Sequence, residues 1–177
     1  MDLRIQKTLE SIEKEFLTLR AKTPLNRIKV NDLCKNAKIN KSTFYRYFKD
    51  IFDLSDKIEN ETIDRIMENF TTLNCLFSNP KVFIKGLLAA VGQYNDKILT
   101  LFGGRIYIFA DKIEARLKSH YLSSPCSLED DIMMSFLIGG ATHVFLNPKY
   151  DIESGTKTLA ELLRRINDAA NAPDPPQ

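Results

Sequence analysis

One stretch of this chain, from Lys41 to Lys49, combines side chains that could bind another molecule. Its sequence is Lys41-Ser42-Thr43-Phe44-Tyr45-Arg46-Tyr47-Phe48-Lys49. In a helix, Phe44 and Phe48 would share one face, because residues four apart are neighbours. The other face would present hydrogen-bond donors, cationic groups and phenol rings, and no carboxylate interrupts it before Asp50. That chemistry suits the phosphates and base edges of the DNA major groove.

A helix this short needs other elements to hold it. Apolar residues predict a preceding helix over residues 30–37, and a three-residue turn follows it. Asn40 is expected to cap the helix 41–48, because its side-chain oxygen can accept a backbone N–H of the first turn. Residues 3–20 predict a covering helix with one apolar stripe. The expected core is Leu9, Phe16, Leu33, Ala37, Ile39, Phe44 and Phe48.

The segment Lys41–Asp50 resembles the recognition helix of the TetR/AcrR family of bacterial transcriptional regulators. In order, the family signature has a small residue, a threonine, either phenylalanine or leucine, a tyrosine, any residue, either histidine or tyrosine, and a phenylalanine. A charged turn follows the signature. Upstream, Ile28–Cys34 is similar to the start of the family's second helix. The resemblance covers residues 4–60, and beyond them only a general pattern of helices agrees.

The resemblance implies an all-α protein with two parts. Residues 1–50 would form an N-terminal three-helix, helix-turn-helix DNA-binding head. Residues 51–177 would form a C-terminal helical bundle for ligand binding and dimerisation. The charges agree, because residues 1–50 hold 12 Lys and Arg against 6 Asp and Glu, whereas the rest holds 13 against 17. A basic head indicates a polyanionic partner, and a solvated surface is the alternative explanation.

The expected DNA contacts combine side-chain chemistry with the family pattern. Lys41 and Arg46 have the reach and charge for phosphates or guanine edges. Tyr45 and Tyr47 resemble the phosphate-contacting positions of the family. The alternative is an ordinary short helix with a polar outer face, which the combined cap, turn, aromatic pair and charge disfavour. The full expected set is Lys29, Asn31, Asn40, Lys41, Ser42, Thr43, Tyr45, Arg46, Tyr47 and Lys49.

Three residues depart from the family pattern. Lys38 stands in the turn where the family commonly has glycine, so either the backbone is strained there or the turn differs. Lys29 replaces the usual threonine cap of the second helix. Ile51 replaces a common lysine, which would remove one phosphate contact.

The rest of the chain predicts six further helices, and a cap at Asn79 with Pro80 in the first helical position marks the start of one of them. Their expected ranges are 51–76, 80–93, 95–102, 105–121, 128–146 and 153–170. The last two are apolar over much of their surface. In the family, the corresponding two helices pair with their copies in a second protomer. Gly139 and Gly140 lie within a helix at a cost of roughly 1 kcal/mol each relative to alanine. Close approach of a second protomer would compensate, and an intrachain neighbour is the alternative. The expected dimer interface is Ile132, Phe136, Gly139, Gly140, His143, Leu159, Leu163 and Ile166.

A small apolar or amphipathic effector would bind among the helices between residues 51 and 121. Most aromatic residues there are expected to be core, and some could line a pocket. The candidates are Phe70, Phe77, Tyr94, Phe102, Tyr107 and Phe109.

Several functions lack the residues that they need. No motif for a catalytic nucleophile or a phosphate loop occurs, so we expect neither an enzyme nor a cofactor. His120 and His143 have no ligand-spaced partners, so no metal site is expected. No apolar run is long enough to span a membrane, and the N-terminus does not resemble a signal peptide. Together with three unpaired cysteines, these features favour a cytoplasmic protein with reduced thiols.

The sequence therefore predicts a homodimeric repressor that binds a palindromic operator in double-stranded DNA and is released by the effector. Three alternatives stay open. The chain could be an activator or a regulator controlled by a protein partner. It could be a DNA-binding protein without an effector. It could also be a ligand-binding or enzymatic α-bundle that has lost DNA binding.

Overall fold

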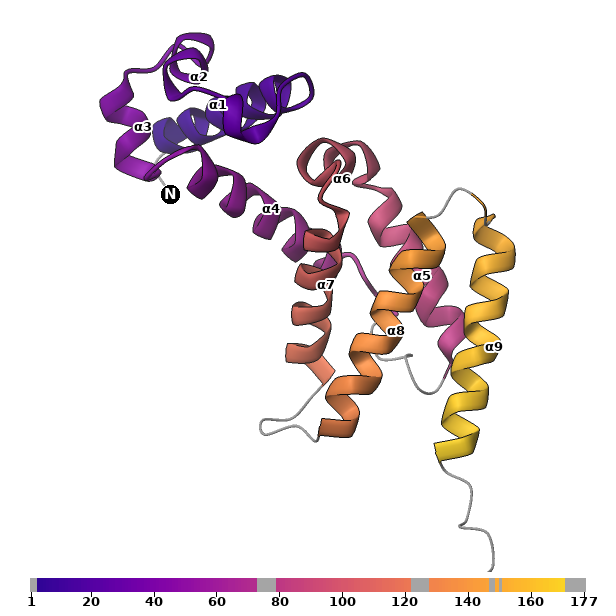
Figure 1. Ribbon diagram of the computed structural model, residues 1–177. Coiled ribbons are helices and arrows are strands. Elements are labelled where there is room, and N and C mark those ends of the chain that lie inside the picture. Colours follow the sequence, from indigo (N-terminus) through magenta and orange to yellow (C-terminus); the bar gives the residue numbers. More distant parts are fainter. Residues whose placement is uncertain (1–2, 73–78, 122–127, 147–148, 150, 171–177) are drawn as a thin grey trace, which may run out of the picture. The chain divides into compact units, whose positions relative to one another are not determined.

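The computed structural model describes residues 3–72, 79–121, 128–146, 149 and 151–170, and most of them lie in helices (Figure 1). No strand occurs in these ranges, so the predicted all-α class is confirmed. No helix in them is long and apolar enough to cross a membrane. The elements are α1 (Leu3–Arg20), the 3₁₀ helix η1 (Leu25–Arg27), α2 (Val30–Asn36), α3 (Lys41–Tyr47), α4 (Ile51–Glu68), α5 (Pro80–Gly92), α6 (Asn95–Phe102), α7 (Ile106–Tyr121), α8 (Leu128–Leu146) and α9 (Ile152–Ala170).

All predicted helices begin and end within one residue of these bounds except one. The helix predicted over residues 51–76 ends at Glu68. Beyond it, the backbone N–H of Phe70 donates to the carbonyl of Met67, which closes a turn instead of continuing the helix. The Phe70 ring packs edge-on against Phe83 of α5, with ring centroids 5.0 Å apart. This contact between distant residues favours ending α4 early.

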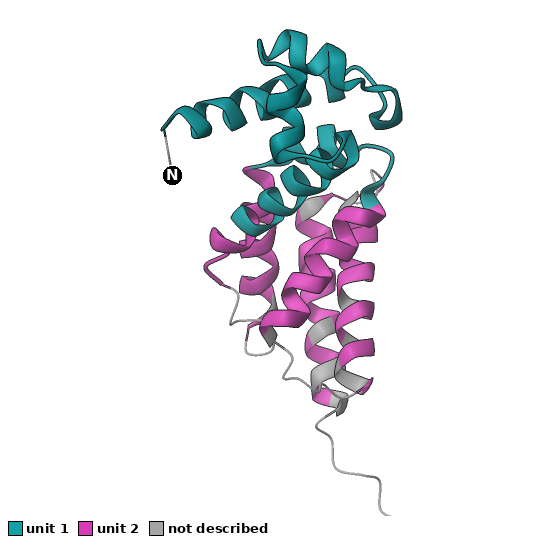
Figure 2. Cartoon of the chain, turned by 90° about the vertical axis from the view of Figure 1, so that its left-hand side faces the viewer, with its two compact units in different colours: residues 1–65, 94–106 teal, residues 66–93, 107–177 magenta. Residues whose placement is uncertain are grey.

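The helices form two compact units (Figure 2). Unit 1 comprises residues 1–65 and 94–106, and it therefore contains α1, η1, α2, α3, α6 and most of α4. Unit 2 comprises residues 66–93 and 107–177, with α5, α8, α9 and nearly all of α7. The functional boundary predicted after residue 50 stays a prediction.

Helix α6 belongs to unit 1 because it packs on α1. Nζ of Lys97 lies 2.6 Å from Oε1 of Glu13. Nη2 of Arg20 donates to the carbonyl of Leu101 at 3.3 Å. Leu101 and the neighbouring Phe102 are fully buried. Unit 1 is thus closed by a helix far along the chain from the first three helices.

The core of unit 1 contains most of the predicted residues. Phe16, Leu33, Ala37, Phe44 and Phe48 are buried, as predicted. The predicted Leu9 and Ile39 are only half-buried. The other buried hydrophobic side chains come mainly from α1, α4 and α6. They are Ile12, Ile28, Cys34, Ile51, Leu54, Ile58, Ile63, Ile98, Leu101 and Phe102.

The turn between α2 and α3 closes as a Schellman motif around Lys38. The N–H of Ile39 donates to the carbonyl of Cys34 at 3.0 Å, and the N–H of Lys38 donates to the carbonyl of Lys35 at 3.3 Å. Lys38 has a φ of 54°, in the left-handed region that favours glycine. The lysine in this turn therefore adopts a strained backbone conformation.

The side-chain cap predicted at Asn40 is wrong. Asn40 precedes α3, but its side chain forms no capping hydrogen bond. Its main-chain carbonyl instead accepts the N–H of Thr43 at 3.0 Å. Capping occurs one helix later, where Oδ1 of Asp50 accepts the N–H of Asp53 at 2.8 Å and Oδ2 of Asp53 accepts the N–H of Lys49 at 2.9 Å. Together, these two hydrogen bonds fix the start of α4 against the end of α3.

In unit 2, α9 packs against both α5 and α8. Lys118 joins α7 to α8, since its Nζ lies 2.7 Å from Oδ1 of Asp131. Helix α5 begins as predicted: Oδ1 of Asn79 accepts the N–H of Val82 at 3.3 Å, and Pro80 occupies the first helical position.

Candidate nucleic-acid interface

The inner face of helix α3 carries two buried aromatic rings, and its predicted contact residues lie on the other side of the helix. The rings of Phe44 and Phe48 are buried, with centroids 5.5 Å apart. The helix exposes Lys41, Ser42, Tyr45 and Arg46, and it leaves Thr43 and Tyr47 half-buried. Every predicted contact on α3 therefore reaches the surface, with Tyr45 56% exposed.

The remaining predicted contacts flank α3 and are all exposed, namely Lys29, Asn31, Asn40 and Lys49. Sequence reasoning missed Lys35 and Lys38, which are exposed at the end of α2 and in the turn. Charge density could have identified them, because residues 28–49 hold six Lys and Arg and one acid, Asp32. All six cations are exposed.

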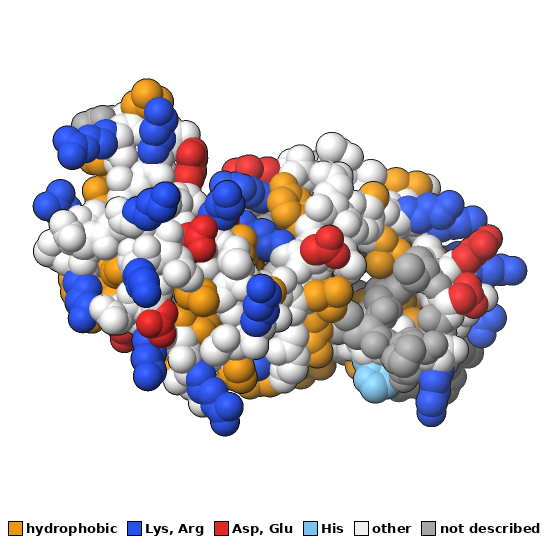
Figure 3. All heavy atoms as spheres, turned by 90° about the horizontal axis from the view of Figure 1, so that it is seen from above, with side chains coloured by type: hydrophobic (Ala, Val, Ile, Leu, Met, Phe, Trp, Pro, Cys, Tyr) orange, Lys and Arg blue, Asp and Glu red, His pale blue; other side chains and the backbone are white. Residues whose placement is uncertain are grey.

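The cations of residues 28–49 form no ion pair with another described residue. The carboxylates that follow α3 are occupied, since Asp50 and Asp53 accept backbone N–H groups. Figure 3 shows the result in its left-hand part, where Lys and Arg side chains project from a largely uncharged surface with few acids between them. This surface can therefore attract a polyanion.

Ile51 does not occupy a contact position. It is buried at the start of α4, so a lysine there would have to leave the core to reach a phosphate. Its buried side chain makes no surface contact, and the expectation that isoleucine removes a DNA contact at this position stays a prediction. Nearby, Nζ of Lys57 lies 5.3 Å from the ring centroid of Phe48, within the range of a cation–π contact.

Cys34 lies behind this surface and is buried. Burial raises the pKa of its thiol, and the charge of Lys41 opposes that shift. The thiol is therefore protonated at neutral pH and poorly nucleophilic.

The aromatic residues predicted to line an effector pocket are not brought together in one unit. Tyr94 and Phe102 belong to unit 1, whereas Phe70, Tyr107 and Phe109 belong to unit 2. Phe70, Phe102 and Phe109 are buried, Tyr94 is half-buried and Tyr107 is 62% exposed. Phe77 lies outside the described residues. The pocket stays a prediction.

The residues predicted for the dimer interface leave an apolar stripe on α8. Ile132 is 57% and Phe136 68% exposed, and Leu128 continues the stripe. Gly139, Gly140 and His143 are exposed on the same helix. A Cβ built on either glycine would meet no atom of the described residues within 4 Å. The described part of the chain therefore offers no intrachain neighbour that explains them.

On α9, Leu159 is half-buried, and Leu162, which was not predicted, is exposed. Leu163 and Ile166 lie within the helix, but their side chains are outside the description. Among the described residues, no three His, Cys, Asp or Glu side chains form a group that could hold a metal ion.

The chain matches no protein-family model, no curated protein and no solved structure. The resemblance to the TetR/AcrR family thus rests on the residues of the chain itself.

Proposed function

We propose that this chain is a transcriptional regulator that binds double-stranded DNA through α3, as its resemblance to the TetR/AcrR family implies. One observation carries the proposal. The six cations of residues 28–49 are exposed without an ion pair to a described residue, beside the hydroxyls and phenol rings of α3. In this proposal α1, α2 and α3 form a helix-turn-helix head, and α3 enters the major groove.

The roles of the side chains follow from their chemistry. Arg46 can donate two hydrogen bonds to one guanine or phosphate, whereas Lys41 acts as a point charge. Tyr45 and Tyr47 would donate their hydroxyls to phosphate oxygens. Lys29 and Asn31 would contact the backbone from the start of α2. Phosphate contacts would give affinity, and the first turn of α3 would give sequence preference.

The regulator would act as a homodimer on a palindromic operator. The support is the exposed stripe of Leu128, Ile132 and Phe136 together with the uncovered Gly139 and Gly140. Large apolar side chains left in water favour association, because burial stabilises them. Two heads related by a two-fold axis would then contact two half-sites.

We further propose that the protein is a repressor and that a small apolar or amphipathic effector releases it. Release requires the effector to bind more tightly to a dimer whose heads have the wrong spacing for the operator.

The test is a selection of bound duplexes from a random pool by the full chain, followed by fluorescence anisotropy on the selected duplex at several salt concentrations. We expect a palindromic consensus and an affinity that falls steeply with salt. Arg46→Ala should weaken binding by about tenfold and reduce the salt slope by about one. Tyr45→Phe should cause a smaller loss.

Lys85→Ala is the matched control, because Lys85 is an exposed cation on α5 outside the proposed interface. It should leave both affinity and slope unchanged. Equal duplex binding by the parent chain, Arg46→Ala and Tyr45→Phe at every salt concentration would reject the proposal.

A further inference from the structure

A second cationic feature of unit 1 lies away from α3, at the end of α1. A hollow of about 550 Å³ opens to solvent there. It is lined by residues 20–26, by Phe52 of α4 and by residues 103–105 between α6 and α7. This volume is within the range of sites that hold small organic molecules.

Among the described residues, three cations line the hollow and no acid does. They are Arg20, Lys22 and Arg105. The nearest carboxylate in the hydrogen-bond network is Glu59, which is buried behind the hollow and accepts from Nη2 of Arg105 at 2.9 Å and from Ser55 at 2.9 Å. One carboxylate therefore faces two guanidinium groups, and positive charge is in excess.

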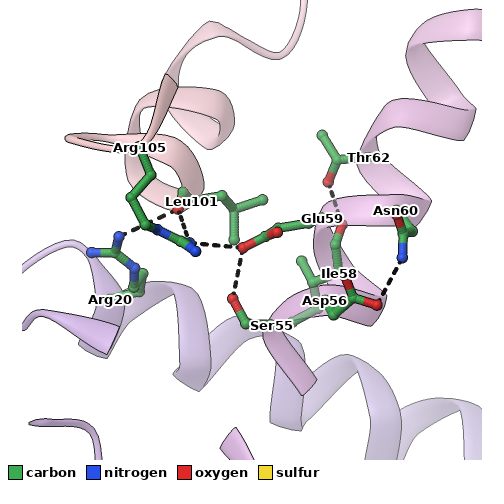
Figure 4. Close-up of polar contacts among 9 residues, drawn as sticks. All are labelled: Arg20, Ser55, Asp56, Ile58, Glu59, Asn60, Thr62, Leu101 and Arg105. Carbon is green, nitrogen blue, oxygen red and sulfur yellow. Dashed lines mark hydrogen bonds and ion pairs between the residues drawn. The ribbon is translucent and has the colours of Figure 1, made fainter. Parts of the chain in front are cut away.

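The two arginines lie next to each other in Figure 4 and share one acceptor. Nη2 of Arg105 donates to the carbonyl of Leu101 at 3.0 Å, and Nη2 of Arg20 donates to the same carbonyl at 3.3 Å. The Nε atoms of both are buried and have no hydrogen-bond partner among the described residues. Burial, and then the charge of Arg105, lower the pKa of Arg20, while Glu59 opposes the shift. The guanidinium groups thus repel each other, and an added anion would reduce that repulsion.

The rest of the lining is suited to a flat apolar group. Phe52 is 57% exposed, so one large ring borders the hollow without being covered by the described chain. Pro24 and Leu25 add apolar surface, and Thr23 and Asn26 add hydrogen-bonding groups. A ligand with one anionic end and one flat apolar end would match both kinds of surface.

We propose that this hollow binds a small organic anion that carries a carboxylate or phosphate group on a flat apolar ring. The anionic group binds beside Arg20, Lys22 and Arg105, and the ring lies against Phe52. This site is separate from the effector pocket predicted among the later aromatic residues, and it does not depend on DNA binding.

Calorimetric titration of the full chain tests the chemistry of the site. The probes are benzoate, phenyl phosphate and inorganic phosphate, with benzyl alcohol as the uncharged analogue of benzoate. Benzoate or phenyl phosphate should bind at least about tenfold more tightly than benzyl alcohol and than inorganic phosphate. Added salt should weaken the binding of the charged probes. The stronger of the two ring-bearing anions identifies the preferred acidic group. Equal binding of benzoate and benzyl alcohol, or no binding of any anion up to about 10 mM, overturns the proposal.

Two exposed residues locate the site without disturbing the buried network. Lys22→Ala should weaken benzoate binding by about threefold or more, and Phe52→Ser should weaken benzoate but not inorganic phosphate. The matched controls are Lys14→Ala, an exposed lysine on α1, and Leu99→Ser, which is as exposed as Phe52 but does not line the hollow. Arg105 is kept, because its loss would remove the guanidinium group that forms an ion pair with the buried Glu59.

Amide chemical shifts give an independent readout. Benzoate should shift the signals of Ala21, Gly103 and Gly104, which line the hollow. Binding that persists equally in both the Lys22→Ala and Phe52→Ser variants, or shifts that leave these amides unchanged, would place the anion elsewhere and refute the site.

Discussion

The exposed faces of α3 and α9 both carry cations, but the two helices differ in whether these cations form ion pairs. On α9, Nη1 of Arg164 lies 2.6 Å from Asp168, and both Arg164 and Arg165 lie within 3.0 Å of Oε1 of Glu161. On α3, Lys41 and Arg46 form no ion pair with a described residue. The charges of α9 are neutralised within its own surface, whereas those of α3 can attract an external anion.

Helix α8 exposes a third kind of surface. Apart from His143, the exposed side chains that the structure describes on α8 are apolar or glycine, and its buried Met134 and Ile138 make it apolar on a second face as well. Unit 1 thus exposes a cationic surface, and unit 2 exposes an apolar one. Changes on each surface should therefore alter different measurements.

The largest contrast is expected between two Phe→Ala changes. Phe44 is fully buried beneath α3, so Phe44→Ala should lower the free energy of unfolding by about 3–5 kcal/mol. Phe136 is 68% exposed, so Phe136→Ala should change it by less than about 0.5 kcal/mol in dilute protein. Urea unfolding at two protein concentrations measures both. A comparable loss of unfolding free energy in both variants, measured in dilute protein, would show that Phe44 and Phe136 do not differ in burial.

The α8 surface is next in expected effect. Gly139→Arg would place a charge in the proposed dimer interface and should raise the dimer dissociation constant by about 100-fold or more. Gly92→Arg is the control, because Gly92 is also exposed with no described atom within 4 Å of a Cβ built there. Sedimentation equilibrium gives the association state. The dimer prediction fails if the parent chain is monomeric, or if both arginine variants associate as the parent does.

A smaller effect is expected at the turn before α3. Lys38 has a φ of 54°, so Lys38→Gly should raise the free energy of unfolding by about 1 kcal/mol. Gly104, with a φ of 77°, is the reverse case, and Gly104→Ala should lower it by about 1 kcal/mol. Thermal and urea unfolding measure both changes. A loss of stability in Lys38→Gly would mean that the lysine side chain contributes more than the strain costs.

The smallest effect concerns the neutralised charges of α9. Hydrogen bonds from Arg164 and Arg165 lower the pKa of Glu161 from 4.5 to about 2. The unfolded chain therefore takes up this proton first as the pH falls. The contribution to stability is fully present above about pH 4.5 and is lost as the pH falls through about 2.

An NMR titration of the Glu161 side-chain carboxyl should give a midpoint near 2. The midpoint should move towards 4.5 when both Arg164 and Arg165 are replaced by alanine. A midpoint already near 4.5 in the parent chain would show that the α9 ion pairs are absent in solution.

Local patterns in the sequence were sufficient for most of the fold. Apolar spacing identified the helices, and the Phe44–Phe48 pair indicated which face of α3 is buried. The family pattern marked Lys38 as an unusual residue in its turn, and its positive φ bears this out. The exposure of the predicted contact residues on α3 also followed from helical periodicity, because it depends on neighbours three and four residues away.

The failures all depend on contacts between distant residues or on competing hydrogen bonds. Periodicity could not show that Phe70 leaves α4 to pack on Phe83. It could not show that Lys97 of α6 pairs with Glu13 of α1. Asn40 has the right chemistry for a cap, but its main chain alone closes the first turn of α3. Glu59 lies at a core spacing in α4, and only the fold reveals its partner Arg105.

The docking of α6 on α1 bears on the order in which the chain can fold during synthesis. The ion pair between Glu13 and Lys97 joins residues 84 positions apart. It therefore cannot form until Lys97 has been synthesised and has left the ribosome. Contacts of such long range slow folding, because a long loop must close before they stabilise anything. Unit 1 is therefore complete only after α6 has been synthesised, and a nascent chain that ends before residue 94 lacks the helix that closes this unit.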